Sequence, residues 1–157
     1  MPTNLGKAFE QRFKLDFIKS FPDGTIDRLV DSVSGFKTVS NVSDFIGYSF
    51  PQIMYLECKS CLGNTFPLSN LTQYEKLCTK VGIKGVRAGV ILWMRDHDKI
   101  LYVPISSITK MKEDGKKSVN IKMLNEDTYK ILVIPTEKKR TFLEGDYTVL
   151  MQLQDGE

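Results

Sequence analysis

Two carboxylates and one amine lie near each other in this sequence, around the end of an apolar run. Asp44 precedes a Glu-x-Lys tripeptide formed by Glu57, Cys58 and Lys59. Because alternate side chains of a β-strand share a face, Glu57 and Lys59 would project side by side from a strand otherwise built of core residues. Core strands rarely carry such a pair, so the pattern indicates a metal-dependent phosphodiesterase.

The residue types suit that chemistry. Mg²⁺ prefers oxygen ligands and keeps several waters, so one or two carboxylates and a substrate phosphate are enough to bind it. Asp44 and Glu57 would supply the carboxylates, and the backbone carbonyl of Cys58 a third oxygen. The ion would lower the pKa of a bound water, and Lys59 would orient that water or offset charge in the transition state. An ion pair at the solvated end of a strand is the alternative that these residues leave open.

Three short motifs resemble a known family. They are residues 44–47 (Asp-Phe-Ile-Gly), 56–60 (Leu-Glu-Cys-Lys-Ser) and 65–70 (Thr-Phe-Pro-Leu-Ser-Asn). Together they resemble the core of the RecU-type Holliday junction resolvases, which belong to the PD-(D/E)xK nuclease superfamily. Residues 6–10 resemble the first helix of that family and residues 90–105 its next two strands. The resemblance covers about residues 4–110.

The resemblance implies a mixed central β-sheet flanked by helices, the restriction-endonuclease-like α/β fold. It makes Asp44 and Glu57 the metal ligands and Lys59 the catalytic lysine. Glu10 would be an accessory acidic residue and Gln73 a polar contact from a later helix. The implied cofactor is Mg²⁺, with Mn²⁺ as a substitute. The implied partner is a four-way DNA junction, bound by a symmetric homodimer whose two sites cut opposed strands.

The sequence departs from the family pattern in three places. Val42 stands where the family usually has a hydroxyl residue, and Gln73 lies nearer to the Phe-Pro-Leu-x-Asn element than the family glutamine does. The segment before Asp44 also lacks the basic, proline-containing insertion with which RecU enters a junction. Two alternatives therefore remain: a phage or restriction-type PD-(D/E)xK nuclease acting on duplexes or flaps, and a non-catalytic DNA-binding or protein-binding module.

Length and charge agree with a DNA-directed protein. The 157 residues predict a single domain over 1–157, with the nuclease core at about 4–110 and a C-terminal extension at 111–157. A net charge of +3 is compatible with a polyanionic partner. Basic residues gather at 110–112, 116–117 and 138–140. Each cluster is either a contact to a phosphate backbone or a solvated loop tip.

The remaining composition points to a cytoplasmic protein, in a bacterial cell or in the host of a phage. The sequence has no apolar run long enough to cross a membrane and no apolar leader at its N-terminus. The three cysteines, Cys58, Cys61 and Cys78, fit reduced thiols. A structural zinc site needs about four ligands, and His97 is the only histidine, so a zinc site at Cys58-x-x-Cys61 is not expected.

Periodicity predicts the elements that position these residues. A helix over 5–20 begins after Asn4 as N-cap. Its predicted apolar face carries Phe9, Phe13, Phe17, Ala8, Leu15 and Ile18. Strands are expected at 25–32, 44–49, 52–60, 86–94, 99–103, 118–122 and 129–134. Helices are expected at 69–80 and 104–112, and a loop at 35–41. Residues 141–153 show both periods and receive no assignment.

Overall fold

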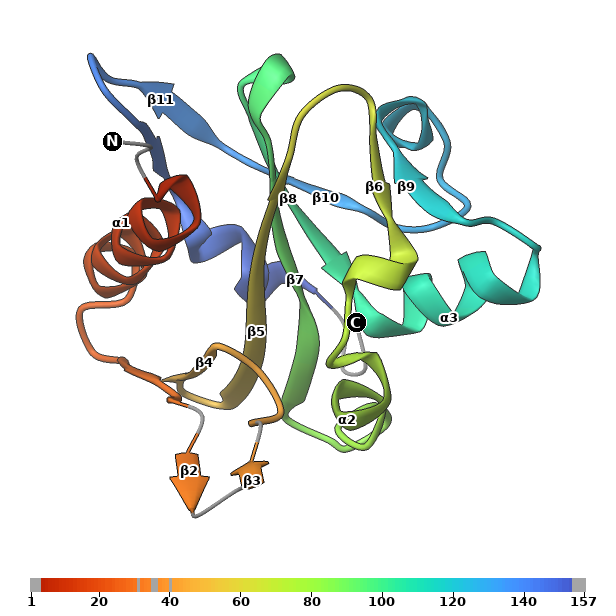
Figure 1. The fold of residues 1–157 in the computed structure, drawn as a ribbon. Helices are drawn as coiled ribbons and strands as arrows, with labels where there is room; N and C mark the ends of the chain where they lie inside the picture. Colours follow the sequence, from red (N-terminus) through yellow and green to blue (C-terminus); the bar gives the residue numbers. More distant parts are fainter. Residues whose placement is uncertain (1–3, 31, 35–36, 40, 154–157) are drawn as a thin grey trace.

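A mixed β-sheet forms the centre of the molecule. The computed structural model describes residues 4–30, 32–34, 37–39 and 41–153. The sheet has six strands in the order β1-β4-β5-β7-β8-β10. They are β1 (Thr25–Arg28), β4 (Phe45–Ser49), β5 (Gln52–Cys61), β7 (Val86–Met94), β8 (Lys99–Pro104) and β10 (Leu132–Ile134). Helix α1 (Leu5–Ser20) covers one face, and α2 (Tyr74–Cys78) and α3 (Ile105–Glu113) cover the other (Figure 1).

Shorter elements lie outside this central sheet. Three two-stranded ribbons pair β2 (Ser32–Ser34) with β3 (Lys37–Val39), β6 (Thr65–Pro67) with β9 (Ser118–Asn120), and β11 (Thr136–Lys138) with β12 (Leu143–Gly145). The described residues also form the 3₁₀ segments η1 (Leu68–Asn70), η2 (Arg95–His97), η3 (Ile121–Asn125) and η4 (Tyr147–Gln152). Within the described ranges, no helix combines the length and the apolar character needed to cross a bilayer.

The first helix begins and packs as its sequence predicts. The Asn4 side chain accepts a hydrogen bond from the Lys7 backbone N–H at 3.1 Å. Phe9, Phe13 and Phe17 recur every fourth residue and are buried against the sheet. The broader apolar face was predicted wrongly, because Ala8, Leu15 and Ile18 are exposed. Leu15, for example, lies about 200° around the helix from Phe13.

The strand order explains why the central strands are so apolar. Strands β4 and β5 are antiparallel, whereas β5 and β7 are parallel. A parallel pair needs a crossover connection, and here it carries β6, η1 and α2. Both faces of β5 and β7 are therefore covered. The α1 side packs around Phe13, Met54 and Ile91, and the other side around Leu77 and Met111.

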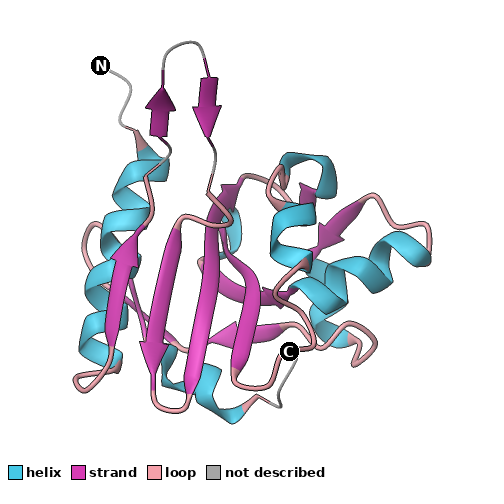
Figure 2. Ribbon diagram, turned by 90° about the horizontal axis from the view of Figure 1, so that it is seen from below, coloured by secondary structure: helices cyan, strands magenta, loops and turns pink. Residues whose placement is uncertain are grey.

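The two predicted strands that would carry the site, and the next two strands, are confirmed with small shifts at their ends. Other elements differ. The predicted strand over 25–32 ends at Arg28, with Asp31 outside the described residues. The predicted loop over 35–41 is wrong for Lys37–Val39, which pairs with β2; Gly35, Phe36 and Ser40 lie outside the described residues. The β2–β3 hairpin projects beyond the sheet, from the edge where β1 ends and β4 begins (Figure 2).

The predicted helix over 69–80 is also wrong in extent. The chain forms η1 and then the short α2, separated by Leu71 in a non-helical conformation. Leu68 and Leu71 are both buried, so tertiary packing overrides the local preference for one continuous helix. The predicted strands at 118–122 and 129–134 are shorter, forming β9 and β10. The predicted helix at 104–112 is confirmed as α3.

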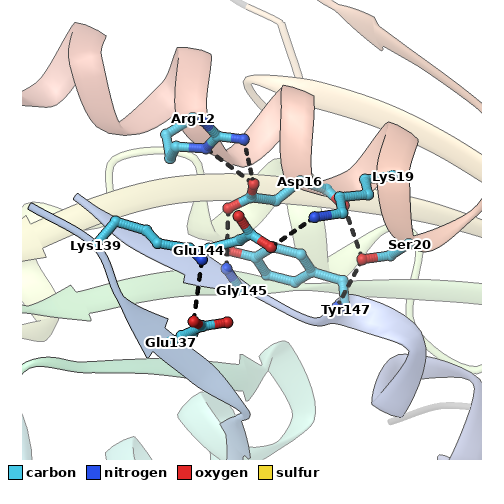
Figure 3. A network of polar contacts seen from close by, with 9 residues as sticks. All are labelled: Arg12, Asp16, Lys19, Ser20, Glu137, Lys139, Glu144, Gly145 and Tyr147. Atoms are coloured by element: carbon cyan, nitrogen blue, oxygen red, sulfur yellow. Dashed lines mark hydrogen bonds and ion pairs between the residues drawn. The ribbon is translucent and has the colours of Figure 1, made fainter. Parts of the chain in front are cut away.

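The C-terminal segment without a predicted structure belongs to the α1-side core. Asp16, 1% exposed, accepts hydrogen bonds from the Gly145 backbone N–H at 2.9 Å and from the Arg12 guanidinium at 2.6 and 2.8 Å. The Tyr147 backbone N–H donates to the Ser20 hydroxyl at 3.0 Å (Figure 3). These contacts, together with the burial of Tyr147, hold β12 and η4 against α1.

Candidate active site

Asp44 and Glu57 meet where β4 begins beside the middle of β5. The antiparallel register pairs Phe45 with Leu56, so Asp44 and Glu57 stand opposite each other one position further on. The Asp44 backbone N–H donates to Glu57 Oε2 at 3.0 Å. The Cys58 backbone N–H donates to Asp44 Oδ2 at 2.9 Å. These two hydrogen bonds hold both carboxylates in one place, as the sequence predicted.

Lys59 lies beside them on the same face of the sheet. Its Nζ is 3.8 Å from Glu57 Oε1. Glu57 and Lys59 align with Val90 and Leu92 in the parallel register of β5 and β7. Because Val90 and Leu92 belong to the core under α2 and α3, the candidate site opens on that side of the sheet. The side chains predicted for the chemistry are therefore brought together.

The chain before β4 is held by a residue that the sequence analysis did not single out. Ser43 is 3% exposed, and its hydroxyl donates to the Phe45 backbone carbonyl at 2.7 Å. The Asp44 carbonyl accepts a hydrogen bond from the Leu29 backbone N–H at 2.7 Å. Together these bonds orient Asp44 where its strand begins. A serine directly before the acidic residue was the available sequence signal, because short hydroxyl side chains commonly bond nearby backbone groups.

The paired carboxylates change the protonation of the site. Glu57 is 2% exposed, and burial followed by the negative charge of Asp44 raises its pKa from 4.5 to about 8, against the opposing effect of Lys59. Burial, with the charge of Asp44 next in importance, also raises the pKa of the Cys58 thiol well above its ordinary value. Without a cation, the site therefore retains a proton at neutral pH that a bound metal ion would displace.

The oxygen atoms present fit a hard divalent cation. Two carboxylates with one backbone oxygen suit Mg²⁺ or Mn²⁺, which complete their shells with water. In an extended strand the N–H and C=O of one residue point to the same side, so the Cys58 carbonyl faces the side on which its N–H bonds Asp44. The Cys58 side chain instead packs in the α1-side core. Within the described ranges, no three His, Cys, Asp or Glu side chains form a metal-binding cluster.

Glu10 lies on α1 and is ion-paired with Arg28 of β1. Its Oε2 accepts hydrogen bonds from Arg28 Nη2 at 2.9 Å and Nε at 3.0 Å. The charge of Glu10 contributes to the raised pKa of the Cys58 thiol. Glu10 and Arg28 also line a hollow of about 260 Å³ with Lys14 and Phe45. A role for Glu10 beside the metal stays a prediction.

Gln73 is hydrogen-bonded to a neighbouring residue rather than to the candidate site. It immediately precedes α2, and its Oε1 accepts a hydrogen bond from the Thr72 hydroxyl at 2.8 Å. In the described part of the chain, no hydrogen bond joins Gln73 to Asp44, Glu57 or Lys59. Its assignment as a polar contact of the site therefore stays a prediction that this geometry does not support.

Comparison with known proteins decides the family. A model of the recombination protein U (RecU) family matches residues 28–140. The chain belongs to the RecU family. The resemblance predicted from the sequence is thereby confirmed. The part of the chain that matches the RecU model includes Asp44, Glu57, Lys59 and Gln73, whereas Glu10 lies before it. A search of curated proteins found no match.

A solved structure supports the fold. Hjc, a Holliday junction resolvase from the archaeal hyperthermophile Archaeoglobus fulgidus, matches with a TM-score of 0.57 and 19% sequence identity. The match covers 82% of this chain and 95% of Hjc. At that identity the likeness concerns the fold. The RecU-family chain thus has the predicted restriction-endonuclease-like α/β fold, with a mixed sheet between helices.

Proposed function

We propose that this RecU-family protein is a divalent-metal-dependent endonuclease that resolves four-way DNA junctions during recombination. Family membership supports the reaction and its place in recombination. The observation that carries the assignment of the site is the buried Asp44–Glu57 pair, in which burial and mutual repulsion raise the Glu57 pKa to about 8. Such a pair is costly for stability unless it binds a cation.

The chain's own residues have distinct parts in this mechanism. Asp44 and Glu57 would hold Mg²⁺ or Mn²⁺ together with the Cys58 carbonyl. When bound there, a divalent ion would supply Lewis acidity to the phosphate and to a bound water. Lys59, whose Nζ is 3.8 Å from Glu57 Oε1, would orient that water or stabilise charge on the phosphate oxygens. Glu10 would be an accessory acidic residue that approaches the metal from α1.

The assembly follows from the reaction. Resolving a junction requires two cuts in opposed strands, and a twofold-symmetric dimer presents two sites in matching orientation. We therefore include a homodimer, acting on cytoplasmic DNA, in the proposal. Light scattering at assay concentrations tests this part, since a purely monomeric protein that still cuts both strands of a junction contradicts it.

A second candidate is cleavage of duplexes or flaps. The β2–β3 hairpin has only three residues in each strand, so the element that projects beside the site is short. An arm of this size supports weak discrimination between a junction and other DNA. The candidate keeps the same metal site and changes only the substrate.

One experiment separates these functions. Purified protein is incubated with Mg²⁺ or Mn²⁺ and a labelled junction, duplex or flap. Preferential cutting of the junction supports resolution, and equal or better cutting of the other substrates supports the second candidate. The Asp44→Asn variant should bind the junction as tightly as the wild type and leave it uncut. Binding without cutting by the wild type in either metal would instead make the protein a non-catalytic DNA-binding module.

A further inference from the structure

A hollow lined by three lysines lies at the turn between α3 and β9. It has a volume of about 470 Å³. Its lining, which we call the lysine hollow, consists of Pro67, Leu68, Ser69, Lys112, Gly115, Lys116 and Lys117. The three lysines are exposed, and no carboxylate belongs to this lining. Figure 1 shows the turn at the far end of α3, next to the β6–β9 ribbon.

The lysines of this hollow differ from those of the 138–140 cluster in their ion pairing. In the described part of the chain, none of Lys112, Lys116 and Lys117 forms an ion pair. The 138–140 cluster is largely neutralised, because Lys138 Nζ lies 2.8 Å from Asp98 Oδ2 and Lys139 Nζ lies 3.0 Å from Glu137 Oε1. The structure therefore distinguishes basic clusters that the sequence left equivalent.

The lysine hollow is held in place by the surrounding backbone. The Lys116 N–H donates to the Met111 carbonyl at 2.8 Å, and the Leu68 N–H donates to the Lys117 carbonyl at 2.9 Å. Lys112 Nζ lies 3.9 Å from the centroid of the Tyr74 ring. Because these contacts already fix the turn, little conformational freedom of its backbone would be lost when a ligand binds.

The hollow and the candidate active site lie on the same side of the sheet. Met111, next to Lys112, belongs to the core that covers Val90 and Leu92. Glu57 and Lys59 align with those two residues. The hollow is therefore on the side of the sheet from which a DNA duplex would reach Glu57.

We propose that the lysine hollow binds the sugar–phosphate backbone of a DNA arm that leads away from the cleavage site. The proposal rests on the proposed function and adds a second contact surface to it. Ammonium groups attract phosphates as point charges, and the Ser69 hydroxyl can donate a hydrogen bond to a phosphate oxygen. Contacts of this kind hold a duplex in position without regard to its base sequence.

The test compares two variants that remove the same number of positive charges. One carries Lys112→Gln, Lys116→Gln and Lys117→Gln, and the matched control carries Lys138→Gln, Lys139→Gln and Arg140→Gln. Junction affinity is measured from 50 to 200 mM salt with uncut DNA, in Ca²⁺ or without metal. We expect the first variant to lower the slope of log K against log salt by about 2 to 3, and to weaken binding at least about tenfold at low salt. The control should change either quantity by less than half as much.

Cutting kinetics provide a second measurement. The lysine hollow lies outside the catalytic group, so the first variant should raise KM and keep kcat within about twofold. The Lys116→Gln, Lys117→Gln double variant retains the contact of Lys112 with Tyr74 and should show about two thirds of the change in salt slope. It remains informative if the triple variant does not fold.

The results with the lysine variants test DNA binding by the lysine hollow and do not test the proposed function. An unchanged salt slope in the folded double or triple variant overturns the proposal, as does a larger loss in the 138–140 control. A triple variant that binds normally but cuts slowly also overturns it. If the wild type cuts junctions and Asp44→Asn does not, the proposed function stands whichever result the lysine variants give.

Discussion

Replacing Glu57 by glutamine should remove a pH-dependent loss of stability from the metal-free protein. Burial and the charge of Asp44 raise the Glu57 pKa from 4.5 to about 8. Between these values the folded protein holds a proton that the unfolded chain has released. The contribution to stability is therefore fully present below pH 4.5, falls as the pH rises, and is lost above about pH 8. Glutamine resembles the protonated carboxyl and does not titrate.

The size of the effect follows from the shift. A rise from 4.5 to about 8 corresponds to about 5 kcal/mol across the whole window. Between pH 6 and 8, the free energy of unfolding of the wild type should fall by about 2 to 3 kcal/mol relative to that of Glu57→Gln. Divalent metal binds the ionised carboxylates, so it should restore about 3 kcal/mol to the wild type at a hundredfold excess over its Kd and nothing comparable to the variant.

The assay is urea unfolding of both proteins in EDTA from pH 5 to 9, repeated with Mg²⁺. A Glu75→Gln variant is the control, because Glu75 is an exposed carboxylate on α2. A difference between wild type and Glu57→Gln that stays constant over this range would refute the reasoning. So would equal stabilisation of the two proteins by Mg²⁺, since the buried pair would then not be the metal site.

Two further changes test the site and its support. Lys59→Ala should lower kcat for junction cutting by about 100-fold or more and leave junction affinity within a few-fold. Single-turnover kinetics measure the change in the rate of cutting. A fall in affinity with unchanged kcat would contradict the role assigned to Lys59. Asp16→Ala should destabilise the fold by about 3 kcal/mol, because it leaves Arg12 and the Gly145 N–H without their buried acceptor. Thermal unfolding measures this loss. Lys19→Ala, which breaks only the exposed pair with Glu144, is the control, and an equal effect of the two changes would count against the Asp16 network.

Local patterns determined much of the fold. The four-residue spacing of Phe9, Phe13 and Phe17 predicted α1, and long apolar runs predicted β5 and β7. Long regular segments are predictable because their periodicity depends on neighbours in the chain. Segment 143–152 could not be assigned in this way, since the hydrogen bonds that hold it against α1 are made to Asp16 and Ser20 at the other end of the sequence. The division of the predicted 69–80 helix likewise depends on the burial of Leu71.

Some features of the candidate site likewise follow from local sequence, and others depend on the tertiary structure. The sequence by itself determined that Glu57 and Lys59 share a strand face and that Asp44 precedes them on a neighbouring strand, because strand alternation is a local property. Only the tertiary structure decided that Glu57 is buried against Asp44 and holds a proton near neutral pH. It also decided that Lys138 and Lys139 have acidic partners, whereas the lining of the lysine hollow contains no acidic residue. Burial and Coulomb energies depend on distances through space between residues far apart in the chain, which no local pattern specifies.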